Sequence, residues 1–97
     1  MRLELSDFVE PDLDEIAAFI AQDNPRRAVT FIQEIRGKFS DIQQSPLLYQ
    51  LRPDIGETAR LATLGNYAIP FRATDDVIRI ERVAYGGRDL PKVFDPS

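Results

Sequence analysis

The chain has 97 residues, 43% of them hydrophobic and 29% charged, which is typical of a globular protein, and we expect one domain over residues 1–97. It contains no cysteine and no histidine, which excludes disulfides, thiolate nucleophiles, imidazole bases and zinc sites built on these residues. The net charge of −4 argues against non-specific nucleic-acid binding, which needs a cationic surplus.

The charge is divided unevenly along the chain. Residues 1–25 contain seven acids and one arginine, a net charge of −6, whereas residues 26–97 contain eleven Lys and Arg against nine acids, a net charge of +2. A local basic surface is therefore compatible with the second part, although we expect no direct sequence-specific nucleic-acid binding. The N-terminus is too charged for a signal peptide and no apolar run approaches a membrane span, so we expect a cytoplasmic protein without membrane contact.

The first residues predict a strand followed by a helix. Residues 1–5 alternate between apolar and polar side chains, which is typical of a half-buried strand. Apolar residues at helical spacing then predict a helix over 7–22, with Ser6 as its N-cap and Pro11 disturbing the first turn. The acids near its start form, most simply, a solvated face favoured by the helix dipole; they are Glu10, Asp12, Asp14 and Glu15.

A second helix follows after a short break. Asn24 is placed to cap it, and Pro25 has the backbone angle that suits a first helical residue. The apolar stripe that follows predicts a long helix over 25–44, which Ser45 and the proline after it terminate. Because the link is short, the two helices are predicted to form an antiparallel hairpin.

Three strands are predicted after a loop, over residues 58–64, 67–74 and 77–85. Pro70 is awkward inside the middle strand, since it cannot donate to a ladder. Arg82 and Val83 interrupt the alternation of the last strand, which predicts a bulge there. The order β-α-α-β-β-β predicts a two-layer α+β domain in which the helical hairpin packs on an antiparallel sheet.

Arginines alternate with apolar residues along these strands. We expect Arg60, Arg72 and Arg79 to lie on the open face of the sheet, opposite a core face formed by Ile69, Phe71, Ile78 and Ile80. Scattered arginines on a solvated sheet face are common. The alternative is a surface that binds an acidic or phosphorylated partner, because arginine is the preferred interface cation.

Six segments of the chain resemble, in order and spacing, the ParE toxins of the ParE/RelE superfamily of type II toxin–antitoxin modules: DLDEIAAFI, DNPRRAVTFIQEI, QQSP, RPDIGETAR, LGNYAIPFR and RIERVAYGGRDL. The resemblance covers about residues 1–92. It implies the fold given above, with the first strand added at the edge of the sheet. It also implies a toxin neutralised by a ParD-like antitoxin within a hetero-oligomeric complex. We expect no cofactor and no metal.

The target depends on the branch of the superfamily, because RelE-like members cut messenger RNA on the ribosome and ParE-like members inhibit DNA gyrase. In the RelE-like ribonucleases a catalytic arginine follows the tyrosine that opens the middle strand, whereas here Ala68 follows Tyr67. A second tyrosine of the ribonucleases corresponds to Phe94, and of the cationic set only Arg88 and Arg60 are left. The resemblance therefore implies gyrase inhibition without catalytic residues. A ribosome-dependent mRNA endonuclease and an inactive homologue that only binds antitoxin remain the alternatives.

The candidate residues fall into two groups. Apolar side chains left partly exposed on a small domain are candidates for antitoxin binding, namely Phe8, Phe31 and Leu48. Candidates for target binding are Arg60, Tyr67, Arg72, Arg79, Arg82 and Arg88. Tyr67 and Tyr85 also have a simpler interpretation as packing aromatics.

The segment VAYGGRDL has two interpretations. Gly86 and Gly87 can form a turn in which an Arg88–Asp89 pair closes the sheet. The same turn can instead project Arg88 toward a partner.

Overall fold

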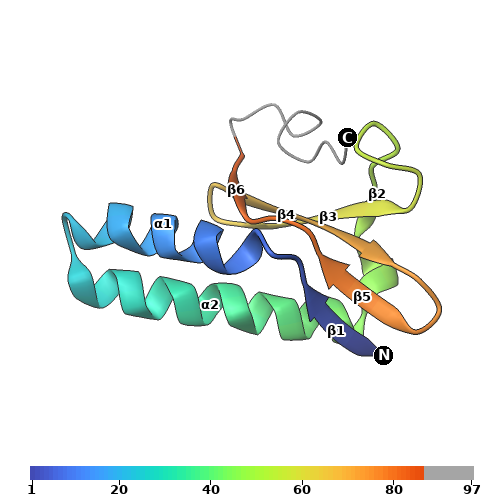
Figure 1. Ribbon diagram of the computed structural model, residues 1–97, viewed down its shortest axis with the longest axis horizontal. Helices are drawn as coiled ribbons and strands as arrows, with labels where there is room; N and C mark the ends of the chain where they lie inside the picture. Colours follow the sequence, from blue (N-terminus) through green and yellow to red (C-terminus); the bar gives the residue numbers. More distant parts are fainter. Residues whose placement is uncertain (87–97) are drawn as a thin grey trace.

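The computed structural model describes residues 1–86 and has two layers, a helical hairpin and a six-stranded sheet (Figure 1). The first half forms β1 (Arg2–Leu5), α1 (Val9–Ala21) and α2 (Pro25–Gln44), and a short 3₁₀ turn, η1 (Pro46–Leu48), follows. The other strands are β2 (Gln50–Leu51), β3 (Ala59–Leu64), β4 (Tyr67–Ala73), β5 (Val77–Ile80) and β6 (Ala84–Tyr85).

The strand order is β1-β5-β4-β3-β2, and β6 continues beyond β5 along β4. β1 pairs with β5 in parallel, and the other pairs are antiparallel. These findings confirm the predicted α+β class, the hairpin on the sheet and the position of the first strand at the edge. The parallel pairing of β1 with β5 makes the sheet mixed, and the hairpin and three strands separate these two partners in the chain.

α1 begins two residues later than predicted, because Ser6 does not cap it. The buried Ser6 hydroxyl accepts a hydrogen bond from the Phe8 N–H at 3.2 Å and donates one to the Glu81 carbonyl, so it links the start of α1 to the sheet. With Val9 as the first helical residue, Pro11 is the third. Its missing N–H would have had no acceptor within the helix, and no hydrogen bond is lost.

α2 has the predicted bounds and the predicted cap. The Asn24 side chain accepts a hydrogen bond from the Arg27 N–H at 3.1 Å, and Pro25 is the first helical residue. One face of the helix is buried against α1 and the sheet, through Ala28, Phe31, Ile35, Phe39 and Ile42.

The core lies between the hairpin and one face of the sheet. α1 contributes Val9, Leu13 and Ile16, and the sheet contributes Ala62, Ile69, Phe71, Ile78, Ile80 and Val83. The four residues predicted for the core face of the sheet are fully buried, which confirms that part of the prediction. Each large apolar side chain buried there stabilises the fold by about 1.5–3 kcal/mol.

The predicted bulge in the last strand is confirmed, and it explains how Pro70 fits the middle of the sheet. Phe71 pairs with Ile80 and Ala68 with Ala84, so three steps along β4 match four along the other strand. The Pro70 carbonyl accepts from the Glu81 N–H at 3.0 Å, so the backbone edge of Pro70 faces the bulge. The missing N–H therefore falls where the ladder is already interrupted.

Candidate functional site

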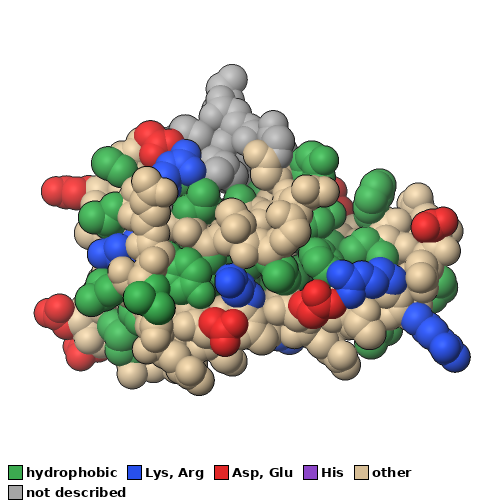
Figure 2. All heavy atoms as spheres, turned by 180° about the vertical axis from the view of Figure 1, so that it is seen from behind, with side chains coloured by type: hydrophobic (Ala, Val, Ile, Leu, Met, Phe, Trp, Pro, Cys, Tyr) green, Lys and Arg blue, Asp and Glu red, His purple; other side chains and the backbone are tan. Residues whose placement is uncertain are grey.

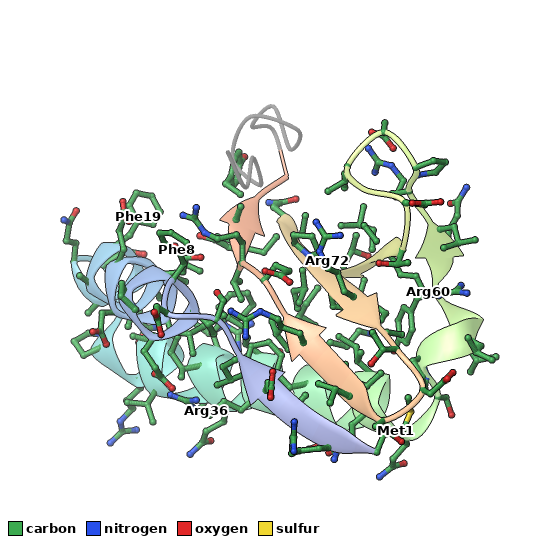
Figure 3. All side chains as sticks on the ribbon, turned by 45° about the vertical axis from the view of Figure 1, so that its right-hand side comes forward. Met1, Phe8, Phe19, Arg36, Arg60 and Arg72 are labelled. Carbon is green, nitrogen blue, oxygen red and sulfur yellow. The ribbon has the colours of Figure 1, made fainter. Side chains whose placement is uncertain are left out.

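Arg60 does not share a face with Arg72 and Arg79, contrary to the sequence-based prediction. It pairs directly with Phe71, and residues that face each other across an antiparallel pair point to the same side of the sheet. Arg60 therefore lies on the side covered by the hairpin, near the β2 edge (Figure 3). Its Nη1 donates to the Tyr49 carbonyl at 2.6 Å, which fastens the segment after η1 to the sheet.

Arg72 and Arg79 are cross-strand neighbours on the open face, as predicted. They share one carboxylate, since the Nε atoms of Arg72 and Arg79 lie 3.5 and 3.4 Å from Oε1 of Glu81. Arg79 also lies 3.5 Å from a carboxylate oxygen of Glu4. The positive charge on this face is thus balanced by acids of the same molecule.

A second apolar cluster covers part of the open face. Ile55, carried by the loop between β2 and β3, packs on three alanines that leave space for it: Ala59, Ala68 and Ala84. Ala68, the residue that follows Tyr67, is buried in this cluster. The same loop approaches Arg72, because a Cβ placed on Gly56 would lie 3.1 Å from the Arg72 guanidinium. The open face is therefore partly filled by the protein itself.

Arg82 and Asp12 form a mostly buried ion pair that was not predicted from the sequence. Arg82 Nε donates to Asp12 Oδ2 at 2.9 Å and Nη2 donates to Oδ1 at 3.0 Å. The Val83 N–H donates to the same carboxylate at 3.0 Å. The hydrogen bond to Asp12 raises the pKa of Arg82, and burial opposes that shift. Asp12 is therefore a connector between α1 and the bulge, and the prediction of a wholly solvated acidic face is wrong at this residue.

Tyr67 belongs to an aromatic cluster at the end of the sheet. Its ring lies 5.5 Å from that of Phe31 and 5.8 Å from that of Tyr85, measured between centroids. Burial raises the pKa of Tyr67, and the neighbouring Tyr85 adds to the shift. This arrangement favours the packing interpretation of Tyr67. Phe31, a candidate for antitoxin binding, is only 7% exposed, so the expectation that it is accessible is wrong.

A groove of about 580 Å³ lies between α1 and the end of the sheet formed by β4 and β6. It is lined by Asp12, Glu15, Ile16, Phe19, Asn66, Tyr67, Val83, Ala84 and Tyr85. Phe8 and Phe19 are 60% and 67% exposed, and both rings project from the side of α1 on which β6 lies (Figure 3). The Phe8 ring also covers the Arg82 guanidinium, with 4.8 Å between the guanidinium carbon and the ring centroid.

The exposure of Phe8 confirms the sequence-based expectation, whereas the prediction missed Phe19. The signal was present in the sequence. Phe19 follows Phe8 by eleven residues, which is three helical turns, so both lie on one face of α1.

A second exposed apolar surface surrounds η1, where Leu47 and Leu48 are exposed next to Met1. Leu48 is 84% exposed, as expected of a candidate for antitoxin binding. These residues line a hollow of about 630 Å³ together with Pro46 and Ala73. η1, which carries both leucines, lies below β2 at the end of the molecule opposite the turn between α1 and α2 (Figure 1).

Arg88 lies outside the described residues, as do Gly87, Asp89 and Phe94. Gly86 is described, and its backbone is not in the left-handed region, since only Gly65 among the described glycines has a positive φ, of 57°. Gly86 is needed instead because the chain approaches Asn66 closely. A Cβ at Gly86 would lie 3.0 Å from the Asn66 carbonyl oxygen.

The described surface has features that are typical of binding sites. Within residues 1–86 no three acidic side chains gather where they could hold a metal ion, and no helix has the length and apolar character needed to cross a membrane. Seen from behind, Lys and Arg side chains are scattered among hydrophobic and acidic ones (Figure 2). Grooves with exposed aromatic rims are typical of sites that bind another protein.

Comparison with known proteins agrees with this picture. The family described as ParE toxin of type II toxin-antitoxin system, parDE, matches residues 3–90. A solved structure described as the chromosomal ParDE TA system from P. aeruginosa is similar with a TM-score of 0.75 and 26% sequence identity, over 88% of this chain and 95% of that chain. No curated protein sequence gives a significant match.

Proposed function

Because the chain belongs to the ParE toxin family of type II toxin–antitoxin systems, we propose that it inhibits bacterial DNA gyrase and that a ParD-like antitoxin neutralises it. Inhibition occurs through binding, and the chain itself catalyses no reaction. Both partners belong to the bacterial cytoplasm, which is the proposed location of the chain.

The observation that carries this proposal is the burial of Ala68. The corresponding position holds a catalytic arginine in the RelE-like ribonucleases that the sequence resembles less closely. Here the side chain is a methyl group, 3% exposed and packed in the apolar cluster with Ile55. An arginine at this position would have to displace Ile55 from the open face.

The ion pairs of the open face support the same conclusion. RNA cleavage needs cations that remain available to the phosphate. Arg72 and Arg79 share Glu81, and Arg60 donates to the Tyr49 carbonyl from the other side of the sheet. A protein target can match such a mixed surface of arginines and carboxylates, whereas a polyanion is repelled by its acids.

The experiment uses the purified full-length chain in two assays with the same protein sample. We expect supercoiling by gyrase to be inhibited, or cleaved DNA to accumulate, and messenger RNA to stay intact on translating ribosomes. Adding the antitoxin encoded beside the toxin gene should restore supercoiling. Codon-positioned cleavage of messenger RNA with unaffected gyrase would favour the endonuclease instead. Inactivity in both assays with normal antitoxin binding would identify an inactive homologue.

The antitoxin part of the proposal rests on exposed apolar side chains. Phe8, Phe19 and Leu48 are exposed to solvent. A chain of only 97 residues has a small core, so exposed apolar side chains matter for its stability. A partner that covers them stabilises the folded state by mass action. The free chain should therefore aggregate or melt at a lower temperature than its complex. If the free chain is monodisperse and its melting temperature does not rise when antitoxin is added, the antitoxin part of the proposal is contradicted.

A further inference from the structure

β1 is the longer of the two strands that border the sheet, with four residues against two in β2, and it pairs with β5 on one side only (Figure 1). The N–H groups of Arg2 and Ser6 donate to carbonyls at the two ends of β5, at 2.9 Å each. Successive residues of a strand direct their backbone groups to opposite edges, so the N–H and C=O of Leu3 point away from β5. They form a free edge of the kind that pairs with another strand.

This outer edge is open at Leu3. Gln43 of α2 donates to the Met1 carbonyl at 2.7 Å, so α2 reaches the beginning of the strand. In the described part of the chain, the outward N–H and C=O of Leu3 have no hydrogen-bond partner. The Leu3 side chain is only partly buried where it packs against the core. A strand added here would pair these backbone groups and cover more of this side chain.

The side chains of β1 alternate between charged and apolar, and the two charges have opposite sign. Arg2 and Glu4 lie on the open face and form an exposed pair, with 3.0 Å between Nη2 and Oε1. Leu3 and Leu5 lie on the other face and contact the core. Since opposite charges that face each other across two strands are stabilising, this pattern determines which strand can pair with β1.

The sequence of β1 is complementary to itself when two copies pair antiparallel about a two-fold axis at Leu3. Each Leu3 then faces the other and exchanges two hydrogen bonds with it, which uses the outward N–H and C=O. Arg2 of each copy faces Glu4 of the other. Moving the axis by one residue would place Arg2 opposite Arg2 or Glu4 opposite Glu4, and both arrangements are destabilising. The charges therefore select one register, and it is the register that the outward groups of Leu3 allow.

We propose that the outer edge of β1 binds a second copy of the chain, through an antiparallel pairing centred on Leu3 that joins the two sheets into one. The contact is isologous, because the same strand contributes from both copies. The open faces of the two copies then lie on the same side of the joined sheet. A strand of four residues gives a small interface, so this dimer is weak and depends on the protein concentration. The inference goes beyond the proposed function and does not depend on it.

The test is sedimentation equilibrium of the free full-length chain at micromolar to near-millimolar concentrations, which separates a discrete dimer from aggregate. Arg2→Glu and Glu4→Arg should each weaken dimerisation about tenfold or more, because each places like charges opposite each other twice. Arg26→Glu makes the same charge change as Arg2→Glu at an exposed site at the start of α2, and it should leave the dimer affinity within about twofold of the wild type. Melting temperatures of the variants verify that the fold is kept.

An equimolar mixture of Arg2→Glu and Glu4→Arg chains tests the register itself. In their heterodimer every charged residue of β1 faces the opposite charge, so the mixture should dimerise although each variant alone is weakened. This measurement also covers Glu4→Arg, which loses the contact of Glu4 with Arg79, because a chain that fails to fold cannot restore a dimer.

The proposal is overturned by three results. A wild type that stays monomeric at the highest concentration shows that the edge does not bind a second copy. If Arg2→Glu weakens the dimer no more than Arg26→Glu does, another surface, such as that around the exposed Leu48, makes the contact. If the wild type dimerises and the mixture of folded variants does not, the register centred on Leu3 is wrong.

Discussion

Asp12 and Arg82, 70 residues apart in sequence, are joined by two parallel hydrogen bonds of 2.9 and 3.0 Å. The Asp12 side chain is 9% exposed and that of Arg82 is 21% exposed. The same carboxylate accepts the Val83 N–H, which the bulge removes from the ladder between strands. One side chain of α1 therefore satisfies both the charge and the free backbone donor of the bulge. The contacts of Asp12 with Arg82 and Val83 thus hold β6 beside α1, and β6 forms one wall of the groove.

The first prediction concerns this pair. Asp12→Ala should lower the free energy of unfolding by about 3 kcal/mol, because it leaves Arg82 and the Val83 N–H without their shared acceptor in a mostly buried place. Glu10→Ala is the matched control on the same helix turn, since the Glu10–Arg36 pair is about half exposed and should contribute at most about 1 kcal/mol. Urea unfolding of both variants measures the difference. Equal losses would show that the Asp12 pair does not hold the bulge in place.

The burial of Asp12 was not predicted from the sequence, although a signal existed. An acid in the first turn of a helix is ordinarily explained by the dipole, and three other acids stand nearby. Asp12, however, shares the buried face of α1 with Val9, Leu13 and Ile16, at helical spacing. An acid among core positions requires a buried partner, and here that partner comes from the far end of the chain.

A second prediction tests the close approach at the end of β6. Gly86→Ala should lower the free energy of unfolding by about 1–2 kcal/mol, because its Cβ would meet the Asn66 carbonyl oxygen at 3.0 Å. The Gly86 N–H donates to the same oxygen, so the carbonyl cannot move away without weakening that bond. Gly37→Ala is the control, since the site lies in α2 with open space around it, and it should stabilise the protein by about 1 kcal/mol. The midpoints of denaturant unfolding measure both stability changes. If both substitutions stabilise the protein, or both destabilise it, the prediction is contradicted.

A third prediction follows from the pKa of Tyr67, which burial raises above its ordinary value. As the pH rises, unfolded Tyr67 loses its proton before folded Tyr67 does. The contribution of Tyr67 to the free energy of unfolding is therefore fully present below the ordinary tyrosine pKa of 10.0. It is lost as the pH rises through the higher pKa of the folded state. The free energy of unfolding should decrease with pH in this alkaline range, and the decrease should be smaller for Tyr67→Phe. Denaturant titrations at several alkaline pH values measure it, and parallel curves for the two proteins would show that Tyr67 makes no contribution.

The reliability of the predictions from sequence depended on how local their signals were. α2 was predicted with its observed bounds because Asn24 and Pro25 determine its start and one continuous stripe defines its face. The face of Arg60 was wrong because β3 carries apolar residues at both odd and even positions, so its alternation does not select a side. A register shift of one residue moves every side chain of a strand to the other face of the sheet. The face of Arg60 is therefore known only from its pairing with Phe71.

The last prediction concerns Arg88, which lies outside the described residues, two positions after the contact between Gly86 and Asn66. If Arg88 binds the target, Arg88→Ala should leave the melting temperature of the antitoxin complex nearly unchanged and sharply reduce toxicity, because interface arginines contribute about 2 kcal/mol or more. Arg26→Ala is the control, since it removes the same charge from an exposed site at the start of α2 and should remain toxic. Colony survival on induction and the melting temperature of the complex are measured together. An Arg88→Ala chain that stays fully toxic excludes target binding by Arg88, whereas one that fails to fold identifies Arg88 as a structural residue.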